Sequence, residues 1–215
     1  IEKKLYLSIK EKTDSVTFNL EKVLKAFSDA RLNVQHFSSQ TGYGHGDLGR
    51  DTIDKIFADV LEAEKAAVRL QLVSGTHAIA SSLFGVLRPG DHLLSITGSP
   101  YESLEEVIGI RGIGQGSLID FGISYDEISL KNDGDIDFLA LEKALQISRK
   151  LIFIQRSCGY TWRPSLSIEV IKEICNLCHK IQPNCICFVD NCYGEFVETK
   201  EPTSVGADLI AGSLI

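Results

Sequence analysis

Methionine is absent from this chain of 215 residues, and position 1 is Ile. Because average usage would place a few methionines in a chain of this length, we expect the natural N-terminus to lie upstream of Ile1. No apolar run is long enough to cross a bilayer, and residues 1–12, which mix charged and apolar side chains, do not resemble a signal peptide. We read this segment as a helix end or an arm, and we expect a cytoplasmic protein.

Positive charge is also in short supply. The chain has 22 Lys and Arg residues against 29 Asp and Glu residues, a net charge of -7. This balance argues against a partner that presents a phosphate backbone, so no nucleic acid is expected. The remaining composition, 44% hydrophobic and 24% charged, is ordinary for a globular protein and suffices for a substantial α/β domain.

Six cysteines are present, and without a secretory signal they are expected to be free thiols. Cys175 and Cys178 lie in an amphipathic helical pattern, while Cys185 and Cys187 share one face of an expected strand. These four thiols with the neighbouring His179 could suggest a zinc site, but zinc ligands of this type usually stand in loops. Packing of Cys as a small hydrophobe is the favoured interpretation, and no metal is expected.

Helical and strand patterns alternate along most of the chain. The expected helices are 51–67, capped by Asp51 or Thr52, then 76–87, 101–110, 136–147 and a last one that Pro164 opens and that runs to Lys180. The expected strands are 68–73, 91–97, 124–130, 150–155, 185–189 and 207–215. This alternation predicts an α/β fold with a mostly parallel sheet covered by helices on both faces.

Ligands of such sheets bind at the carboxyl ends of the strands, so the residues that follow each strand are the candidates for a site. Ser74-Gly75-Thr76-His77 opens a helix, where free N–H groups and the helix dipole favour an anion, although Ser74 and Thr76 are also ordinary helix caps. Tyr101 could form a platform for a ring, or simply pack over the sheet edge. Asp190 ends an apolar strand and needs a positive partner there, unless it caps the following turn.

A loop from Arg156 to Pro164 gathers two Arg residues, Tyr160 and Trp162, the only Trp of the chain. Such a loop suggests contact with a ligand or with a partner subunit. Three histidines also stand near these segments. His77 could touch a ligand, His92 begins a strand away from the active edge, and His45 lies in the glycine-rich loop 42–49.

Taken together, these segments resemble the fold-type-I enzymes that use pyridoxal 5'-phosphate (PLP). The resemblance is narrower to the cystathionine/methionine γ-lyase group and its aluminium-resistance branch, and it runs from about Gly42 to Ile215. The segments that carry it are Gly42-Tyr43-Gly44, Gly49-Arg50-Asp51, Val73-Ser74-Gly75-Thr76-His77-Ala78, Pro100-Tyr101, Gln155-Arg156-Ser157, Val189-Asp190-Asn191-Cys192-Tyr193-Gly194-Glu195 and 206–215.

The resemblance implies a three-layer, PLP-dependent transferase-like large domain over residues 42–215, preceded by an N-terminal arm or helical segment over 1–41. It implies that Gly75, Thr76 and Ser213 bind the cofactor phosphate and that Ser74 also belongs to the cofactor site. It further implies that Tyr101 stacks on the pyridine ring and that Asp190 pairs with the protonated ring nitrogen, with Tyr101 and Asp190 as the catalytic residues. Tyr43 and Arg50 would reach the phosphate of a neighbouring subunit in a homodimer or homotetramer. The Schiff-base Lys is expected directly after Ile215, so the domain would be truncated here, with a C-terminal domain still to follow.

The implied activity is a carbon–sulfur lyase that forms a Schiff base with a sulfur-containing amino acid, removes its α-proton and eliminates a thiol. An aminotransferase or a desulfurase would use the same Asp, aromatic ring and Lys, and a non-catalytic PLP-fold protein is a further alternative. A nicotinamide-binding protein is disfavoured, because Ser74-Gly75-Thr76-His77 lacks the spaced glycines of that class.

Overall fold

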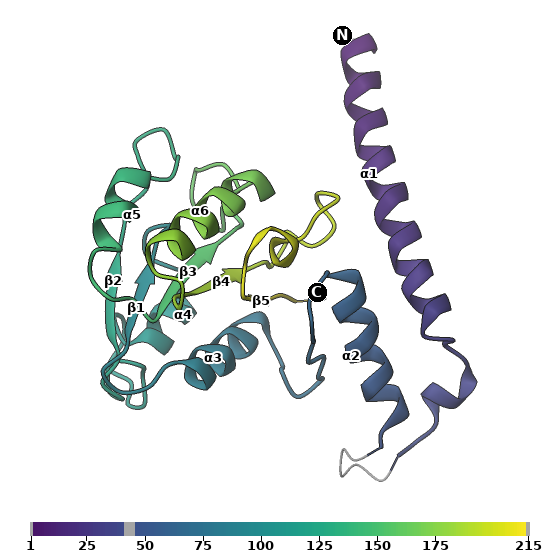
Figure 1. The fold of residues 1–215 in the computed structure, drawn as a ribbon, viewed down its shortest axis with the longest axis horizontal. Helices are drawn as coiled ribbons and strands as arrows, with labels where there is room; N and C mark the ends of the chain where they lie inside the picture. The colour runs from purple at the N-terminus through teal and green to yellow at the C-terminus, as the bar shows by residue number, and fades with distance from the viewer. Residues whose placement is uncertain (1, 41–45, 214–215) are drawn as a thin grey trace. The chain divides into compact units, whose positions relative to one another are not determined.

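The computed structural model describes residues 2–40 and 46–213 (Figure 1). The chain divides into two compact units. The helical unit comprises Ile1–Gln71 with Phe196–Ser204, and the sheet unit comprises Leu72–Glu195 with Val205–Ile215. The expected boundary between residues 41 and 42 lies outside the described residues, and it stays a prediction.

The sheet unit is built on five parallel strands in the order β2-β1-β3-β4-β5. Their bounds are β1 His92–Ser95, β2 Ser124–Glu127, β3 Leu151–Gln155, β4 Ile186–Asp190 and β5 Leu209–Ala211. Because all five run in one direction, their carboxyl ends meet at one edge, and the expected parallel α/β fold is confirmed.

Helices cover both faces of this sheet (Figure 1). α3 (Gly75–Val86) and α4 (Glu102–Ile108) lie on one face, and α5 (Phe138–Ala144) and α6 (Ile168–Ile181) on the other. Alternate strand residues point to opposite faces, so Leu151 and Phe153 pack toward α3 and α4 while Ile152 and Ile154 pack toward α5 and α6. The result is the three-layer arrangement that the sequence predicts.

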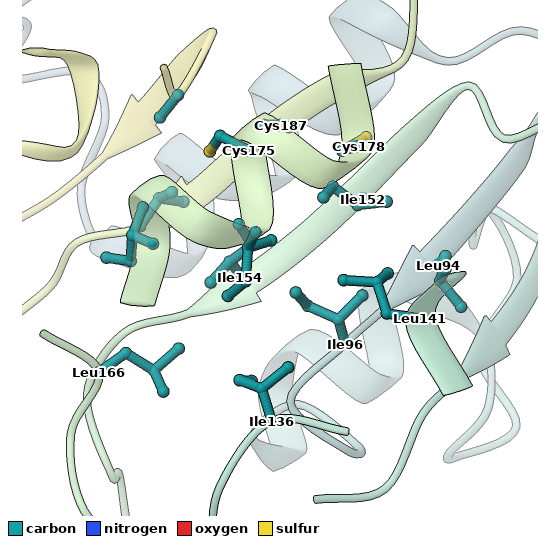
Figure 2. Close-up of a cluster of buried hydrophobic side chains, with 14 of the residues drawn as sticks. Leu94, Ile96, Ile136, Leu141, Ile152, Ile154, Leu166, Cys175, Cys178 and Cys187 are labelled. Carbon is teal, nitrogen blue, oxygen red and sulfur yellow. The ribbon is translucent and has the colours of Figure 1, made fainter. Parts of the chain in front are cut away.

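Four cysteines belong to the layer under α6. Cys175, Cys178, Cys185 and Cys187 are all buried free thiols of the hydrophobic cluster that also contains Ile152, Ile154 and Leu166. Figure 2 shows Cys175, Cys178 and Cys187 in this cluster. Cys175 and Cys178 lie on the inward face of α6, whose apolar residues recur at helical spacing. Free, packed thiols were the expectation for these residues.

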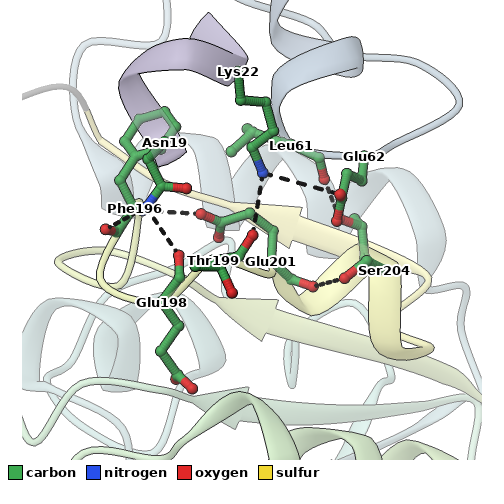
Figure 3. Close-up of polar contacts among 10 residues, drawn as sticks. Asn19, Lys22, Leu61, Glu62, Phe196, Glu198, Thr199, Glu201 and Ser204 are labelled. Atoms are coloured by element: carbon green, nitrogen blue, oxygen red, sulfur yellow. Dashed lines mark hydrogen bonds and ion pairs between the residues drawn. The ribbon is translucent and has the colours of Figure 1, made fainter. Parts of the chain in front are cut away.

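The helical unit contains α1 (Glu2–Asp29), the short 3-10 helix η1 (Val34–Phe37) and α2 (Leu48–Val60). Ala26 of α1 packs against Ile56 and Val60 of α2. The buried Asn19 side chain donates hydrogen bonds of 2.9 Å to the Phe196 carbonyl and 3.1 Å to the Glu198 carbonyl (Figure 3). A residue of α1 thus fixes a segment almost 180 positions later in the chain.

A second 3-10 helix, η2 (Pro202–Val205), follows that segment. Among the helices of the described residues, none is both long and apolar enough to span a membrane.

The expected strand over 68–73 is wrong. The Val68 amide donates to the Asp54 carboxylate at 2.7 Å, the Val73 amide points to His77 Nδ1 at 3.4 Å, and Leu70 is almost fully exposed. Side chains therefore bind the backbone groups that a ladder would need, and the segment crosses from one compact unit to the other.

Two helix starts also differ from expectation. α2 begins at Leu48 and its cap is Asp47, which accepts from the Arg50 amide at 3.0 Å, rather than Asp51 or Thr52. α6 begins at Ile168 with Ser167 as its cap, and not at Pro164. The Leu166 amide donates to the Arg156 carbonyl, which holds the preceding residues in a loop.

Candidate functional site

The first component of the site is the N-terminus of α3, in the sheet unit. Ser74 is its cap, and the Ser74 hydroxyl accepts from the His77 amide at 3.1 Å. The amides of the first turn lack carbonyl partners within the helix, which makes this end favourable for an anion. Both expected roles of Ser74-Gly75-Thr76 are therefore compatible with the geometry, because capping by Ser74 leaves other donors of the turn available.

Thr76 links this helix end to Tyr101. The Thr76 hydroxyl lies 3.1 Å from the Tyr101 hydroxyl and 3.2 Å from the Ser103 hydroxyl. Burial raises the pKa of Tyr101 to about 12, with a further contribution from the nearby Asp190 carboxylate. Tyr101 thus stays protonated at neutral pH and can share its proton with Thr76.

The end of β4 and the end of β5 approach the same point. A Cβ atom placed on Gly75 would lie 2.9 Å from Cys192 Sγ and 3.8 Å from Ser213 Cβ. Gly75 therefore allows a close approach that no other residue permits without displacement. Residues 75, 192 and 213, which are far apart in the sequence, meet at the carboxyl edge of the sheet.

Asp190 is the last residue of β4 and is only 3% exposed. Its carboxylate accepts from the Cys192 amide at 3.1 Å. Burial raises the pKa of Asp190, and among the described residues it forms no ion pair. A buried carboxylate without a cation is costly, so this position favours a ligand that brings a positive charge or a donated proton.

Arg156 supports the loop that follows Asp190. Its guanidinium donates to the Asn191 side-chain oxygen and to the Gly194 carbonyl, both at 2.8 Å, and Arg156 is 3% exposed. Within the loop Tyr193 has a φ of 67°, a left-handed conformation that is uncommon for a residue other than glycine. Arg156 thus binds residues on both sides of Tyr193.

Glu195 holds the segment after β5. Its carboxylate accepts from the Ser213 amide at 3.3 Å, and a side chain on Gly212 would collide with it. Ser213 is thereby placed beside Gly75, and its contact with a phosphate stays a prediction.

The loop 156–164 was expected to contact a ligand or a partner subunit, and its side chains point in different directions. Tyr160 and Trp162 are fully exposed, while Arg156 turns inward. Arg163 donates to the Gln155 carbonyl at 2.9 Å and also to the Ser157 carbonyl. Contact of the two aromatic residues with a ligand or partner stays a prediction.

Five further candidates were Tyr43, His45, Arg50, His77 and His92. Tyr43 and His45 are outside the described residues. Arg50 lies in α2 of the helical unit, with its guanidinium 3.2 Å from the Asp47 carboxylate. His77 Nδ1 faces the Val73 amide, and His92 is the first residue of β1, at the edge opposite Asp190.

Sequence reasoning did not single out Ser103, Cys192 or Asn191 as parts of this site. Cys192 could have been noticed because it follows Asp190 by two positions. The contact of Asn191 with Arg156 gives no sequence signal, since it depends on two strand ends meeting.

The parallel five-stranded sheet with helices on both faces matches the PLP-dependent transferase-like fold. The family model of methionine gamma-lyase matches residues 1–215, and the chain belongs to that family.

Its relatives include an uncharacterized protein of Bacillus subtilis, YnbB, which is 53% identical over 195 residues. That match covers 90% of this chain and 46% of YnbB. The L-methionine gamma-lyase of Pseudomonas putida is 25% identical over 177 residues, which cover 81% of this chain and 39% of that enzyme.

Among solved structures, a carbon-sulfur lyase involved in aluminum resistance from Clostridium novyi NT is 48% identical, with a TM-score of 0.94. The match covers 99% of this chain and 51% of that one. The chain thus spans about half the length of YnbB and of the Clostridium novyi protein.

The residues described above fit PLP. The N-terminus of α3 with the Thr76 hydroxyl suits a phosphate. Asp190, buried and without an ion-pair partner among the described residues, suits a protonated ring nitrogen.

Proposed function

We propose that this chain is the cofactor-binding part of a PLP-dependent carbon–sulfur lyase that acts on a sulfur-containing amino acid. The observation that carries the proposal is Asp190, a buried carboxylate at the end of β4 that lacks an ion-pair partner among the described residues. The family and the names of its relatives support the same activity.

In this proposal Ser74, Gly75, Thr76 and Ser213 hold the phosphate, Tyr101 supports the ring face, and Asp190 keeps a proton on the ring nitrogen. PLP, when bound, supplies an electron sink for the carbanion formed at the α-carbon of an amino acid. Asp190 deepens that sink because its negative charge favours the cationic ring.

Thr76 and Tyr101 have a joint role in positioning. Their hydroxyls are 3.1 Å apart, so the same hydrogen bond ties the phosphate-binding helix end to the aromatic residue. Ring and phosphate are then held by elements that keep a fixed spacing, which orients a bound cofactor before any substrate arrives.

The test is the affinity of the full-length protein for PLP, measured by absorption and fluorescence titration. We expect Asp190→Asn to bind PLP at least about 10-fold more weakly, because a neutral amide cannot balance the ring charge. Glu173→Gln removes one exposed carboxylate from α6 and is the matched control, with affinity unchanged. Equal affinity of wild type and Asp190→Asn would reject the role given to Asp190.

The reaction type is tested separately by incubating the PLP-bound protein with cystathionine, methionine and cysteine. Release of a thiol or sulfide from one of them is expected. Formation of a transaminated product with no release of sulfur would overturn the lyase assignment and leave PLP binding intact.

We further propose a cytoplasmic homo-oligomer, a homodimer or homotetramer, in which Tyr43 and Arg50 contact the phosphate bound by the neighbouring subunit. The support is the resemblance to the family alone.

A further inference from the structure

Outside the proposed cofactor site, a second group of reactive side chains lies at the opposite edge of the sheet. Cys187 is the second residue of β4, Asp208 directly precedes β5, and His179 lies in the last turn of α6. Among the described residues, these three form one group in which a His nitrogen, a Cys sulfur and a carboxylate oxygen all lie within 4.8 Å of one another.

The interatomic distances suit a shared metal ion. Cys187 Sγ lies 3.6 Å from His179 Nε2. A tetrahedral zinc with usual bond lengths of about 2.3 Å to sulfur and 2.1 Å to nitrogen separates those two ligands by about 3.6 Å. His179 Nε2 and the Asp208 carboxylate are 2.9 Å apart, and they would need to separate by about 0.5 Å around an ion.

The backbone keeps this group in place without help from a metal. The Asp208 carboxylate accepts from the Cys187 amide at 2.7 Å, and the Asp208 amide donates to the Cys187 carbonyl at 3.0 Å. Asp208 and Cys187 are therefore fixed relative to each other by two hydrogen bonds, and only His179 depends on the position of α6. A preformed arrangement of this kind lowers the ordering cost of binding.

Access and ligand chemistry both favour a borderline-soft cation. The side chains of His179 and Asp208 are 31% and 44% exposed, while Cys187 is buried, so an ion could enter from solvent and rest against the thiol. Thiolate and imidazole ligands select zinc over magnesium or calcium, which prefer oxygen ligands.

We propose that His179, Cys187 and Asp208 bind a zinc ion at the amino edge of the sheet, with a solvent molecule completing the coordination. On binding, Cys187 loses its thiol proton to solvent and His179 offers the lone pair of Nε2, and no electron is transferred. The ion joins α6, β4 and the segment before β5, so its role is to stabilise the sheet unit. The proposal is independent of the proposed lyase function.

The experiment is a titration of the PLP-bound full-length protein with Zn²⁺ by calorimetry, and with Co²⁺ as a coloured substitute. Wild type is expected to bind one equivalent of Zn²⁺ and to give the visible absorption of tetrahedral Co²⁺ with a thiolate ligand. Mg²⁺ should produce neither signal. Thermal unfolding should shift upward with Zn²⁺, because a ligand of the folded state stabilises it.

Cys187→Ser and His179→Gln should each weaken Zn²⁺ binding more than about 100-fold. This loss exceeds the usual effect of replacing a residue that only hydrogen-bonds to a metal ligand. Asp208→Asn keeps an acceptor for the Cys187 amide, so the fold should be preserved. Its affinity for Zn²⁺ should be lower, because the carboxylate ligand is lost. Cys158→Ser, which removes a thiol outside the group, is the matched control and should bind as wild type does. Folded wild type without Zn²⁺ binding, or folded variants that bind equally well, would overturn the proposal.

Discussion

At the scale of single residues, Asp190 makes the stability of the fold depend on pH. Burial raises its pKa in the folded state above the usual value of an aspartate. The folded protein then binds the proton more tightly than the unfolded chain does, so Asp190 destabilises the fold increasingly as pH rises above the unfolded pKa. The effect is complete above the folded pKa and amounts to about 1.4 kcal/mol per unit of difference.

The first prediction follows from this destabilisation of the fold by ionised Asp190. Asp190→Asn without PLP should be more stable than wild type at pH 7, and the difference should shrink as pH falls below the usual range of aspartate. With PLP bound, the order should invert, because the ring charge stabilises the Asp190 carboxylate. Urea unfolding at several pH values, with and without PLP, measures these differences in stability. If Asp190→Asn were less stable than wild type at pH 7 without PLP, the destabilising effect of buried Asp190 would be contradicted.

Gly75 gives a second prediction about a close contact. Gly75→Ala places a methyl group 2.9 Å from Cys192 Sγ and should weaken PLP binding several-fold by displacing one side of the site. The double variant Gly75→Ala with Cys192→Ala removes the opposing sulfur and should recover much of that loss. A double variant no better than the single one would show that the contact is not the cause.

The site residues that could be predicted from the sequence are those that follow an expected strand. Thr76, Tyr101 and Asp190 could be proposed because each stands just after an expected strand or opens a helix. The group of His179, Cys187 and Asp208 was not found as a set, since Asp208 is brought to Cys187 only by the pairing of β4 with β5. The sequence had favoured plain packing for Cys187.

At the scale of elements, the third prediction concerns the start of α6. The Ser167 hydroxyl accepts from the Val170 amide at 3.4 Å. Ser167→Ala should lower the free energy of unfolding by about 1 kcal/mol, the usual cost of losing such a cap. The exposed Ser148 provides the control, and a Ser148→Ala variant should unfold like wild type. Equal stability of the Ser167 variant would show that another group caps the helix.

Most elements could be predicted because apolar residues recur with a clear period, as in the strand Leu151–Gln155 and the helix Ile168–Ile181. The segment 68–73 has a strand-like composition but is not a strand. Asp54 and His77 engage two of its amides, and no composition rule contains that information. The starts of α2 and α6 also differ from the prediction. Asp47 and Ser167 cap these helices through their side chains, whereas Asp51 or Thr52 and Pro164 were the expected first residues.

At the scale of the whole molecule, the fourth prediction concerns Asn19 in the helical unit. Its amide donates to two carbonyls of the segment that returns from the sheet unit. Asn19→Ala leaves those carbonyls without that donor and should cost about 1–3 kcal/mol. Asp14→Ala, at an exposed position of the same helix, is the control and should unfold like wild type. Unchanged urea unfolding of Asn19→Ala would contradict this account.

The fifth prediction tests the shared site. Arg50→Ala and Asp190→Ala should each be inactive alone. If the sites are shared between two subunits, unfolding and refolding an equal mixture should restore about a quarter of wild-type activity, since half of the dimers would be mixed and each would have one intact site. No recovery in a mixture shown to contain mixed dimers would contradict a site shared between two subunits.

The layer order of the sheet unit could be predicted from the alternation of helices and strands, because parallel strands need helical crossovers on both faces. The division into two units could not. The segment Phe196–Ser204 joins the helical unit through Asn19, a contact between residues far apart in the chain that local patterns do not encode.

The most direct test of the central claim is the absorption spectrum of the full-length protein with PLP, before and after borohydride. If the protein holds PLP as proposed, we expect a band near the visible edge that reduction fixes covalently, with the label mapped to a single lysine. A protein that stays colourless in the presence of added PLP would contradict it, and the fold would then serve a purpose other than PLP chemistry.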